Sequence, residues 1–194
     1  MIKQELYFST DIESDGPIPG INSMLSFGTA VFSPKGELID TFTANLLQLD
    51  GAIENPATMS WWKENLAAWN KCREDPKDPA IVMKEYYDWI NFRCNTELAV
   101  PVFVGYPAGY DFLFIYWYLM KFVGNSPFSF SALDIKTYAS AVLKKPYREC
   151  TKRKFPAKCF SKECKHTHIT LDDAIEQGYL FINMLNENTK GISL

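Results

Sequence analysis

Two acidic residues near the N-terminus are spaced so that they could bind a metal ion. Asp11 and Glu13 follow the β-rich run Leu6–Thr10, and residues two apart on a strand point to the same face of its sheet. Adjacent carboxylates repel each other and resist joint ionisation unless a cation neutralises them. Their hard oxygen atoms suit Mg²⁺ or Mn²⁺. Because such acidic pairs are common on solvated surfaces, a metal site needs further ligands from later in the chain.

Two later carboxylates and a histidine could complete this site. Asp111 follows the apolar run Ala99–Tyr106, and Asp173 lies five residues after His168. Taken singly, Asp111 is explained as a helix N-cap and Asp173 as compensation of a helix dipole. Taken with the first pair, four carboxylates could hold two Mg²⁺ ions about 4 Å apart, while a histidine accepts a proton from water near neutral pH.

The elements that must position these residues follow from the pattern of apolar residues and chain breakers. The predicted strands cover 6–12, 24–33, 38–47, 99–106 and 128–133. The predicted helices cover 59–71, 81–94, 112–123, 135–143 and 171–185. Thr58 and Asp134 are the expected caps of the first and fourth helices. Strands followed by alternating strands and helices predict an α/β fold, in which a mixed sheet of three antiparallel strands and then parallel strands is flanked by helices.

The composition is typical of one globular domain. The chain has 194 residues, of which 47% are hydrophobic and 15% aromatic, so it can bury a core and is not expected to be disordered. The charged residues Lys3 and Glu5 interrupt the N-terminal segment, so we do not expect it to be a secretory signal peptide. The apolar-rich run 112–120 is too short to span a bilayer. Five cysteines, an odd number, argue against a disulfide framework. We therefore expect a cytoplasmic protein without a membrane partner.

The charge is distributed unevenly along the chain. Residues 144–165 contain nine Lys or Arg and two Glu, a net charge of +7, which leaves −10 for the remainder of a chain whose net charge is −3. We expect a single domain, 1–194, that carries a basic insertion at about 144–165. For an isolated patch the favoured interpretation is a solvated loop, whereas beside an active site the insertion could guide a phosphate backbone.

These motifs resemble those of the DEDDh family of 3′–5′ exonucleases, which includes polymerase proofreading subunits, oligoribonuclease and RNase T. The first family motif is matched by residues 11–13, the second by 104–112 and the third by 168–174. Many relatives have His-Asn in the second motif, where this chain has Tyr106-Pro107. The resemblance implies an RNase H-like fold.

The resemblance also implies roles for individual residues. The proposed ligands of two Mg²⁺ or Mn²⁺ ions are Asp11, Glu13, Asp111 and Asp173, and the implied general base is His168. Asp172 and His166 compete for two of these roles, but the family's His-x4-Asp spacing selects His168 and Asp173.

Residues that hold the terminal nucleotide are implied by the family as well. Its members bind this nucleotide with the loop after the first motif, which points here to Ile12, Ser14 and Met24. Trp61 and Trp62 are further candidates for stacking on a base, although tryptophans on helices more often belong to the core.

A second group of metal-ligating residues lies in the basic insertion. It consists of Cys150, Cys159, Cys164 and His166, whose spacing is not that of a standard zinc finger. Reduced, unpaired thiols on a basic loop are the favoured interpretation, and a Zn²⁺ site is the alternative.

The function implied by these features is a metal-dependent 3′–5′ exonuclease that releases nucleoside 5′-monophosphates from single-stranded DNA or RNA. Two alternatives are a catalytically inactive exonuclease-like domain that binds nucleic acid or serves as a scaffold, and an endonuclease of the same fold. The sequence leaves open the choice between DNA and RNA, the substrate length and the oligomeric state.

Overall fold

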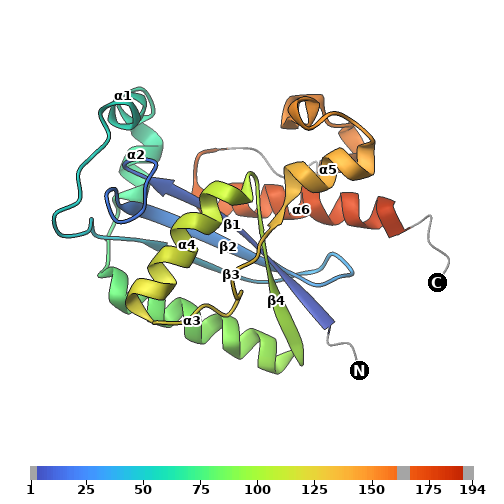
Figure 1. The fold of residues 1–194 in the computed structure, drawn as a ribbon, viewed down its shortest axis with the longest axis horizontal. Helices are drawn as coiled ribbons and strands as arrows, with labels where there is room; N and C mark the ends of the chain where they lie inside the picture. The colour runs from blue at the N-terminus through green and yellow to red at the C-terminus, as the bar shows by residue number, and fades with distance from the viewer. Residues whose placement is uncertain (1–3, 161–166, 190–194) are drawn as a thin grey trace.

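A mixed five-stranded sheet forms the centre of the protein in the computed structural model, which describes residues 4–160 and 167–189 (Figure 1). The strands are β1 (Gln4–Ser14), β2 (Met24–Phe32), β3 (Leu38–Asn45), β4 (Ala99–Gly105) and β5 (Leu133–Asp134). Their spatial order is β3-β2-β1-β4-β5. The first three strands are antiparallel, whereas β4 is parallel to β1 and β5 is parallel to β4. This topology confirms the predicted fold class and the predicted antiparallel meander.

Helices cover both faces of the sheet. The α-helices in the described ranges are α1 (Pro56–Glu64), α2 (Leu66–Cys72), α3 (Pro79–Thr96), α4 (Ala108–Phe122), α5 (Ile135–Leu143) and α6 (Thr170–Thr189). Helices α3 and α4 pack with one face of β1, and α6 packs on the opposite face (Figure 1). None of the helices in the described ranges has the length and apolar character needed to cross a bilayer.

Successive side chains of β1 point to opposite faces of the sheet. Phe8 and Ile12 lie in the core shared with α3 and α4, whereas Tyr7 lies in the core shared with α6. The hydroxyl of Ser9 donates to the carbonyl oxygen of Ala174 on α6, at 2.7 Å. Because strand residues two apart share a face, the odd-numbered side chains of β1 are directed toward α6.

Close packing of α6 on the sheet depends on a glycine. Gly28 of β2 is the register partner of Asp11, and a Cβ atom at this position would lie 2.5 Å from the backbone nitrogen of Leu171. Any larger residue would therefore collide with the first turn of α6. The absence of a side chain lets this turn approach the strand pair that carries Asp11.

Three local predictions were wrong or incomplete. The helix predicted at 59–71 is divided into α1 and α2 at Asn65, whose backbone is not helical. Asn55, rather than Thr58, caps α1, because its side-chain oxygen accepts hydrogen bonds from the backbone of the first turn. The strand predicted at 128–133 is reduced to the short β5, since Ser129 adopts a left-handed backbone conformation. The predicted cap Asp134 is confirmed, and it accepts a hydrogen bond from Thr137.

The basic insertion is attached to the body of the protein. It contains three short 3-10 helices, η1 (Tyr147–Glu149), η2 (Lys152–Lys154) and η3 (Ala157–Cys159). Cys150, Phe155 and Cys159 are buried in the core that includes α6. The side chain of Asn183 on α6 also donates to the carbonyl oxygen of Cys159, at 3.1 Å. The interpretation as a solvated loop is therefore wrong for these apolar residues, because their burial holds the segment against α6.

A Gly28→Ala substitution is expected to destabilise the protein by about 1–3 kcal/mol, because the added methyl group overlaps backbone atoms of α6. Gly109→Ala is the matched control, since a Cβ atom added to Gly109 on α4 would meet no described residue within 4 Å beyond its chain neighbours and the backbone of its own helix. That control is expected to be neutral or slightly stabilising, because alanine favours a helix over glycine. Thermal unfolding of both variants tests this, and equal melting temperatures would contradict the packing argument.

Candidate active site

Four carboxylates from three elements share one region of the structure. Asp11 and Glu13 come from β1, Asp111 from the first turn of α4 and Asp173 from the first turn of α6. The charge of Asp11 interacts with Asp111 and Asp173, and the charge of Glu13 interacts with Asp11 and Asp173. Asp111 and Asp173 are only 4% and 2% exposed. The tertiary structure thus brings together the acids that are distant in sequence.

Asp111 is positioned by the turn between β4 and α4. Pro107 occupies the N-cap position of α4, so the explanation of Asp111 as a helix cap is wrong. Gly105 ends β4, and a Cβ atom there would lie 3.1 Å from Oδ2 of Asp111. This Oδ2 atom is buried and has no hydrogen-bond partner among the described residues. A buried carboxylate oxygen that has no donor is suited to a cation.

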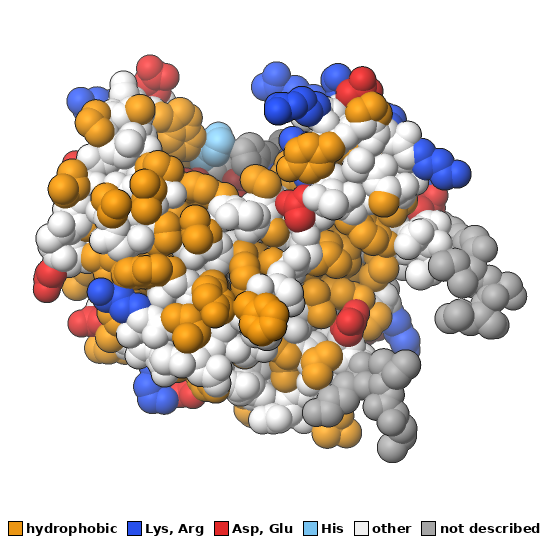
Figure 2. Space-filling model, viewed as in Figure 1, with side chains coloured by type: hydrophobic (Ala, Val, Ile, Leu, Met, Phe, Trp, Pro, Cys, Tyr) orange, Lys and Arg blue, Asp and Glu red, His pale blue; other side chains and the backbone are white. Residues whose placement is uncertain are grey.

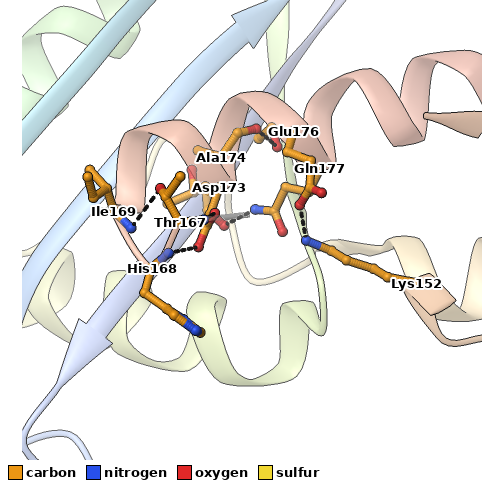
Figure 3. Close-up of polar contacts among 10 residues, drawn as sticks. Lys152, Thr167, His168, Ile169, Asp173, Ala174, Glu176 and Gln177 are labelled. Atoms are coloured by element: carbon orange, nitrogen blue, oxygen red, sulfur yellow. Dashed lines mark hydrogen bonds and ion pairs between the residues drawn. The ribbon is translucent and has the colours of Figure 1, made fainter. Parts of the chain in front are cut away.

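Asp173 connects α6 to the segment that carries His168. Its Oδ1 and Oδ2 atoms accept hydrogen bonds from the backbone N–H groups of Thr167 and His168, at 2.9 and 3.1 Å (Figure 3). His168 has a φ of 58°, a left-handed conformation that is unfavourable for a residue with a side chain. The two hydrogen bonds stabilise this conformation. Asp173 therefore does more than compensate the helix dipole, because it also positions the histidine.

The imidazole of His168 lies beside an aromatic ring and lines a cavity that an acid of the site also lines. Its ring centroid is 5.3 Å from that of Trp61, in an edge-on arrangement. His168 and Glu13 also line the same cavity, which has a volume of about 350 Å³. Of the competing residues, Asp172 is exposed and accepts a hydrogen bond from the hydroxyl of Thr167, and His166 lies outside the described residues.

The proximity of the acids changes their proton affinity. Burial, together with the charges of Asp11 and Asp173, raises the pKa of Glu13 to about 9. Burial also raises the pKa of Asp111 to about 8, although backbone hydrogen bonding with Ile12 opposes the shift. Burial and the neighbouring Asp111 and Asp173 raise the pKa of Asp11 well above its usual value. Either protons or cations must therefore neutralise this region near pH 7.

The donor set fits hard divalent cations. All four acids offer oxygen atoms, and the partnerless Oδ2 of Asp111 provides a buried acceptor. Within the described ranges, no three His, Cys, Asp or Glu side chains are already arranged as a metal-binding group. Asp11, Glu13, Asp111 and Asp173 are the candidate ligands for Mg²⁺ or Mn²⁺.

The candidate substrate-binding residues differ in accessibility. Met24 is fully buried in the core, and Trp62 is also buried and donates a hydrogen bond from Nε1 to the carbonyl oxygen of Ser14. The side chains of Ile12 and Ser14 are buried as well. Trp61 is 37% exposed, so it presents ring surface on which a base could stack.

The candidate zinc ligands are only partly within the described residues. Cys150 and Cys159 are buried in the core beside α6, whereas Cys164 and His166 lie outside the described residues. The zinc site therefore stays a prediction.

Two charged residues that act on the acids were not predicted from the sequence. Lys152 of η2 forms an ion pair with Glu176 of α6, and both charges act on the carboxyl group of Asp11 (Figure 3). Glu176 could have been found, since it lies one helical turn after Asp173 and hence on the same side of α6. Lys152 carried no such signal, because it is one of nine basic residues in its segment.

Comparison with known proteins decides the family. The chain is 35% identical over 190 residues to the 3′–5′ DNA exonuclease Cap18 of Escherichia coli, and the match covers 96% of each chain. The chain belongs to the DEDDh family of 3′–5′ exonucleases. No protein-family model matches this DEDDh exonuclease.

Solved structures share the fold of this DEDDh exonuclease at low sequence identity. One is a full-length 3′-exonuclease, with a TM-score of 0.70, 12% identity, and coverage of 97% of this chain and 84% of that one. Another is the nuclease domain of 3′hExo, a DEDDh family member bound to rAMP, with a TM-score of 0.70, 12% identity, and coverage of 95% and 92%. These likenesses confirm the predicted RNase H-like fold.

Without divalent ions, the DEDDh exonuclease is expected to lose stability as the pH rises. The pKa values of Glu13 and Asp111 are raised in the folded protein, to about 9 and about 8. In the unfolded chain these groups titrate near pH 4. Between about pH 4 and pH 9 the folded state therefore binds more protons than the unfolded state, and the free energy of unfolding falls as the pH rises. Thermal unfolding in EDTA should show a lower melting temperature at about pH 8 than at about pH 5.

Mg²⁺ should reverse this loss, because it neutralises the ionised acids. Its stabilising effect is expected to be larger at the higher pH and to be much smaller in Asp11→Asn. The same substitution removes one repelling charge, so it should raise the melting temperature in EDTA at the higher pH. A melting temperature that rises with pH in EDTA would contradict the assignment of buried, mutually repelling acids.

Proposed function

We propose that this DEDDh exonuclease degrades single-stranded DNA from its 3′ end with two divalent ions, Mg²⁺ or Mn²⁺, and releases nucleoside 5′-monophosphates. The observation that carries the proposal is the convergence of four carboxylates beside a histidine whose backbone is bound to Asp173. The printed name of the Escherichia coli relative, a 3′–5′ DNA exonuclease, supports DNA as the substrate. We also propose that residues 1–194 act as one exonuclease domain with a basic insertion at about 144–165.

The acidic residues would hold the metal ions in this proposal. Asp11, Glu13, Asp111 and Asp173 are the proposed ligands, since their charges lie close enough to act on one another and they offer only oxygen donors. When bound, two divalent ions supply an activated water and stabilise the charge on the leaving oxygen. Asp11 and Glu13 are half-buried rather than fully enclosed, which leaves their side of the site open to a phosphodiester.

His168 is the general base in the proposed reaction. Asp173 fixes the backbone of His168 through the N–H group, and the ring of Trp61 lies against the edge of the imidazole. A half-buried imidazole in this position can accept the proton of the attacking water, because its ordinary pKa lies near neutrality.

The substrate strand would reach the site through an open groove in the surface. Figure 2 shows a hollow between the α1–α2 pair and the basic insertion, with Lys and Arg side chains gathered on the insertion. Trp61 contributes exposed ring surface from α1, where it can stack on the terminal base. The positive charges on the other side attract the phosphate backbone.

Substitutions in the site should abolish hydrolysis while a neighbouring substitution does not. His168→Ala is expected to lower kcat about 10²- to 10⁴-fold, the usual contribution of a general base. Asp173→Ala should remove nearly all activity, because it removes a metal ligand and releases the histidine segment. The matched control is Asp172→Ala, since Asp172 is the exposed neighbour of Asp173. Stepwise shortening of a 5′-labelled single strand with Mg²⁺ or Mn²⁺ measures these effects, and a folded Asp173→Ala protein with wild-type activity would defeat the proposal.

Substrate choice separates the proposed activity from its alternatives. Matched DNA and RNA ladders should show faster shortening of DNA, and a circular single strand should remain intact because it has no 3′ end. Cleavage of the circle would identify an endonuclease. Tight binding of the linear strand without metal-dependent shortening would identify an inactive nucleic-acid-binding domain.

A further inference from the structure

A half-buried ion pair joins the basic insertion to the helix of the active site. Nζ of Lys152 in η2 pairs with the carboxylate of Glu176 on α6 (Figure 3). The side chains of Lys152 and Glu176 are 24% and 11% exposed. The pair is therefore more shielded from water than an ordinary surface ion pair, yet the lysine remains accessible.

The position of this pair relates it to the catalytic acids. Glu176 lies one helical turn after Asp173 and on the same side of α6. Nζ of Lys152 lies 5.7 Å from the ring centroid of Tyr106. Tyr106 directly follows β4 and precedes the turn that positions Asp111. The charge of Lys152 also favours ionisation of Asp11 and Asp111. A cation paired with α6 thus acts on two of the acids proposed to bind the metal ions.

The insertion has other attachments that do not involve this pair. Cys150 and Phe155 are buried, and the hydroxyl of Tyr106 donates to the carbonyl oxygen of Cys150, at 2.9 Å. A second ion pair, between Lys158 and Glu187, also joins the insertion to α6. It is more exposed than the first pair. Because anchoring is supplied elsewhere, the Lys152 pair is available for another task.

We propose that Lys152 is a phosphate-binding residue of the active site, which exchanges its ion pair with Glu176 for a phosphodiester of the bound strand. The proposal rests on the exonuclease function proposed above. A lysine ammonium on its flexible stem can turn from a carboxylate to a phosphate without moving the backbone. Glu176 competes with the substrate for this cation and holds it in place between binding events.

The two members of the pair should have opposite effects on substrate binding. Lys152→Ala is expected to raise KM for a single-stranded oligonucleotide about tenfold, with a smaller change in kcat, because one charge-assisted contact is lost. The salt dependence of binding should also weaken by about one unit of slope. Glu176→Gln should lower KM about threefold, because Lys152 no longer has to leave an acidic partner. Lys152→Arg should restore most of the lost affinity.

The matched control is Lys158→Ala, which removes the ion pair between Lys158 of η3 and Glu187 of α6. It is expected to leave KM close to that of the wild type, apart from the small effect of one distant charge. If the Lys152 pair only anchors the insertion, Lys152→Ala and Glu176→Gln should both lower the melting temperature and change KM in the same direction. That result, or an equal KM for Lys152→Ala and Lys158→Ala, would overturn the proposal.

A binding measurement separates this proposal from the proposed function. Fluorescence anisotropy of a 5′-labelled oligonucleotide in Ca²⁺ reports on Lys152 whether or not hydrolysis occurs. If the wild type shortens no DNA or RNA in Mg²⁺ or Mn²⁺, the exonuclease proposal fails, and weaker binding by Lys152→Ala alone still supports the phosphate site. If the wild type is active and Lys152→Ala binds as tightly as the wild type, only the phosphate site fails.

Discussion

Repulsion among buried carboxylates is the constraint on which this structure depends. Asp11, Glu13, Asp111 and Asp173 occupy one region, and burial disfavours the ionised form of the first three. Burying charge without compensation costs several kcal/mol, so the remainder of the fold must hold these groups in place. Two apolar cores, one on each face of the sheet, supply that rigidity.

The same constraint explains the local backbone geometry around the site. Gly28 lets the first turn of α6 approach β2, which brings Asp173 toward Asp11. The carboxylate of Asp173 accepts hydrogen bonds from the backbone N–H groups of Thr167 and His168, and so stabilises the left-handed conformation of His168. A single acid is therefore connected both to the charge cluster and to the proposed base. The arrangement explains why a small shift of α6 would disturb both groups at once.

The basic insertion complements the acidic body in a specific place. Buried apolar residues of the insertion pack in the core beside α6, whereas Lys152 pairs with Glu176 on that helix. The insertion thus does more than add positive charge, because the burial of its apolar residues fixes the position of Lys152. A chain with a net charge of −3 thus places a cation on the helix that also carries Asp173.

The sequence by itself determined the fold class, the family and the residue types of the site. Apolar and β-rich runs bounded by chain breakers predicted the strands, and three short motifs in order predicted the DEDDh family. Local capping was less predictable: Asn55 caps α1 although Thr58 is an equally good cap by type, because the choice depends on where the backbone enters the helix. The division of one predicted helix at Asn65 had no clear sequence signal either.

Only the tertiary structure decided which residues meet. The burial of Met24 and Trp62, the exposure of Trp61 and the pairing of Lys152 with Glu176 all depend on packing between segments far apart in the chain. A motif specifies residue types at fixed spacing, but the free energy of a contact depends on distance, burial and neighbouring charge. Those quantities exist only after β1, α4 and α6 have come together.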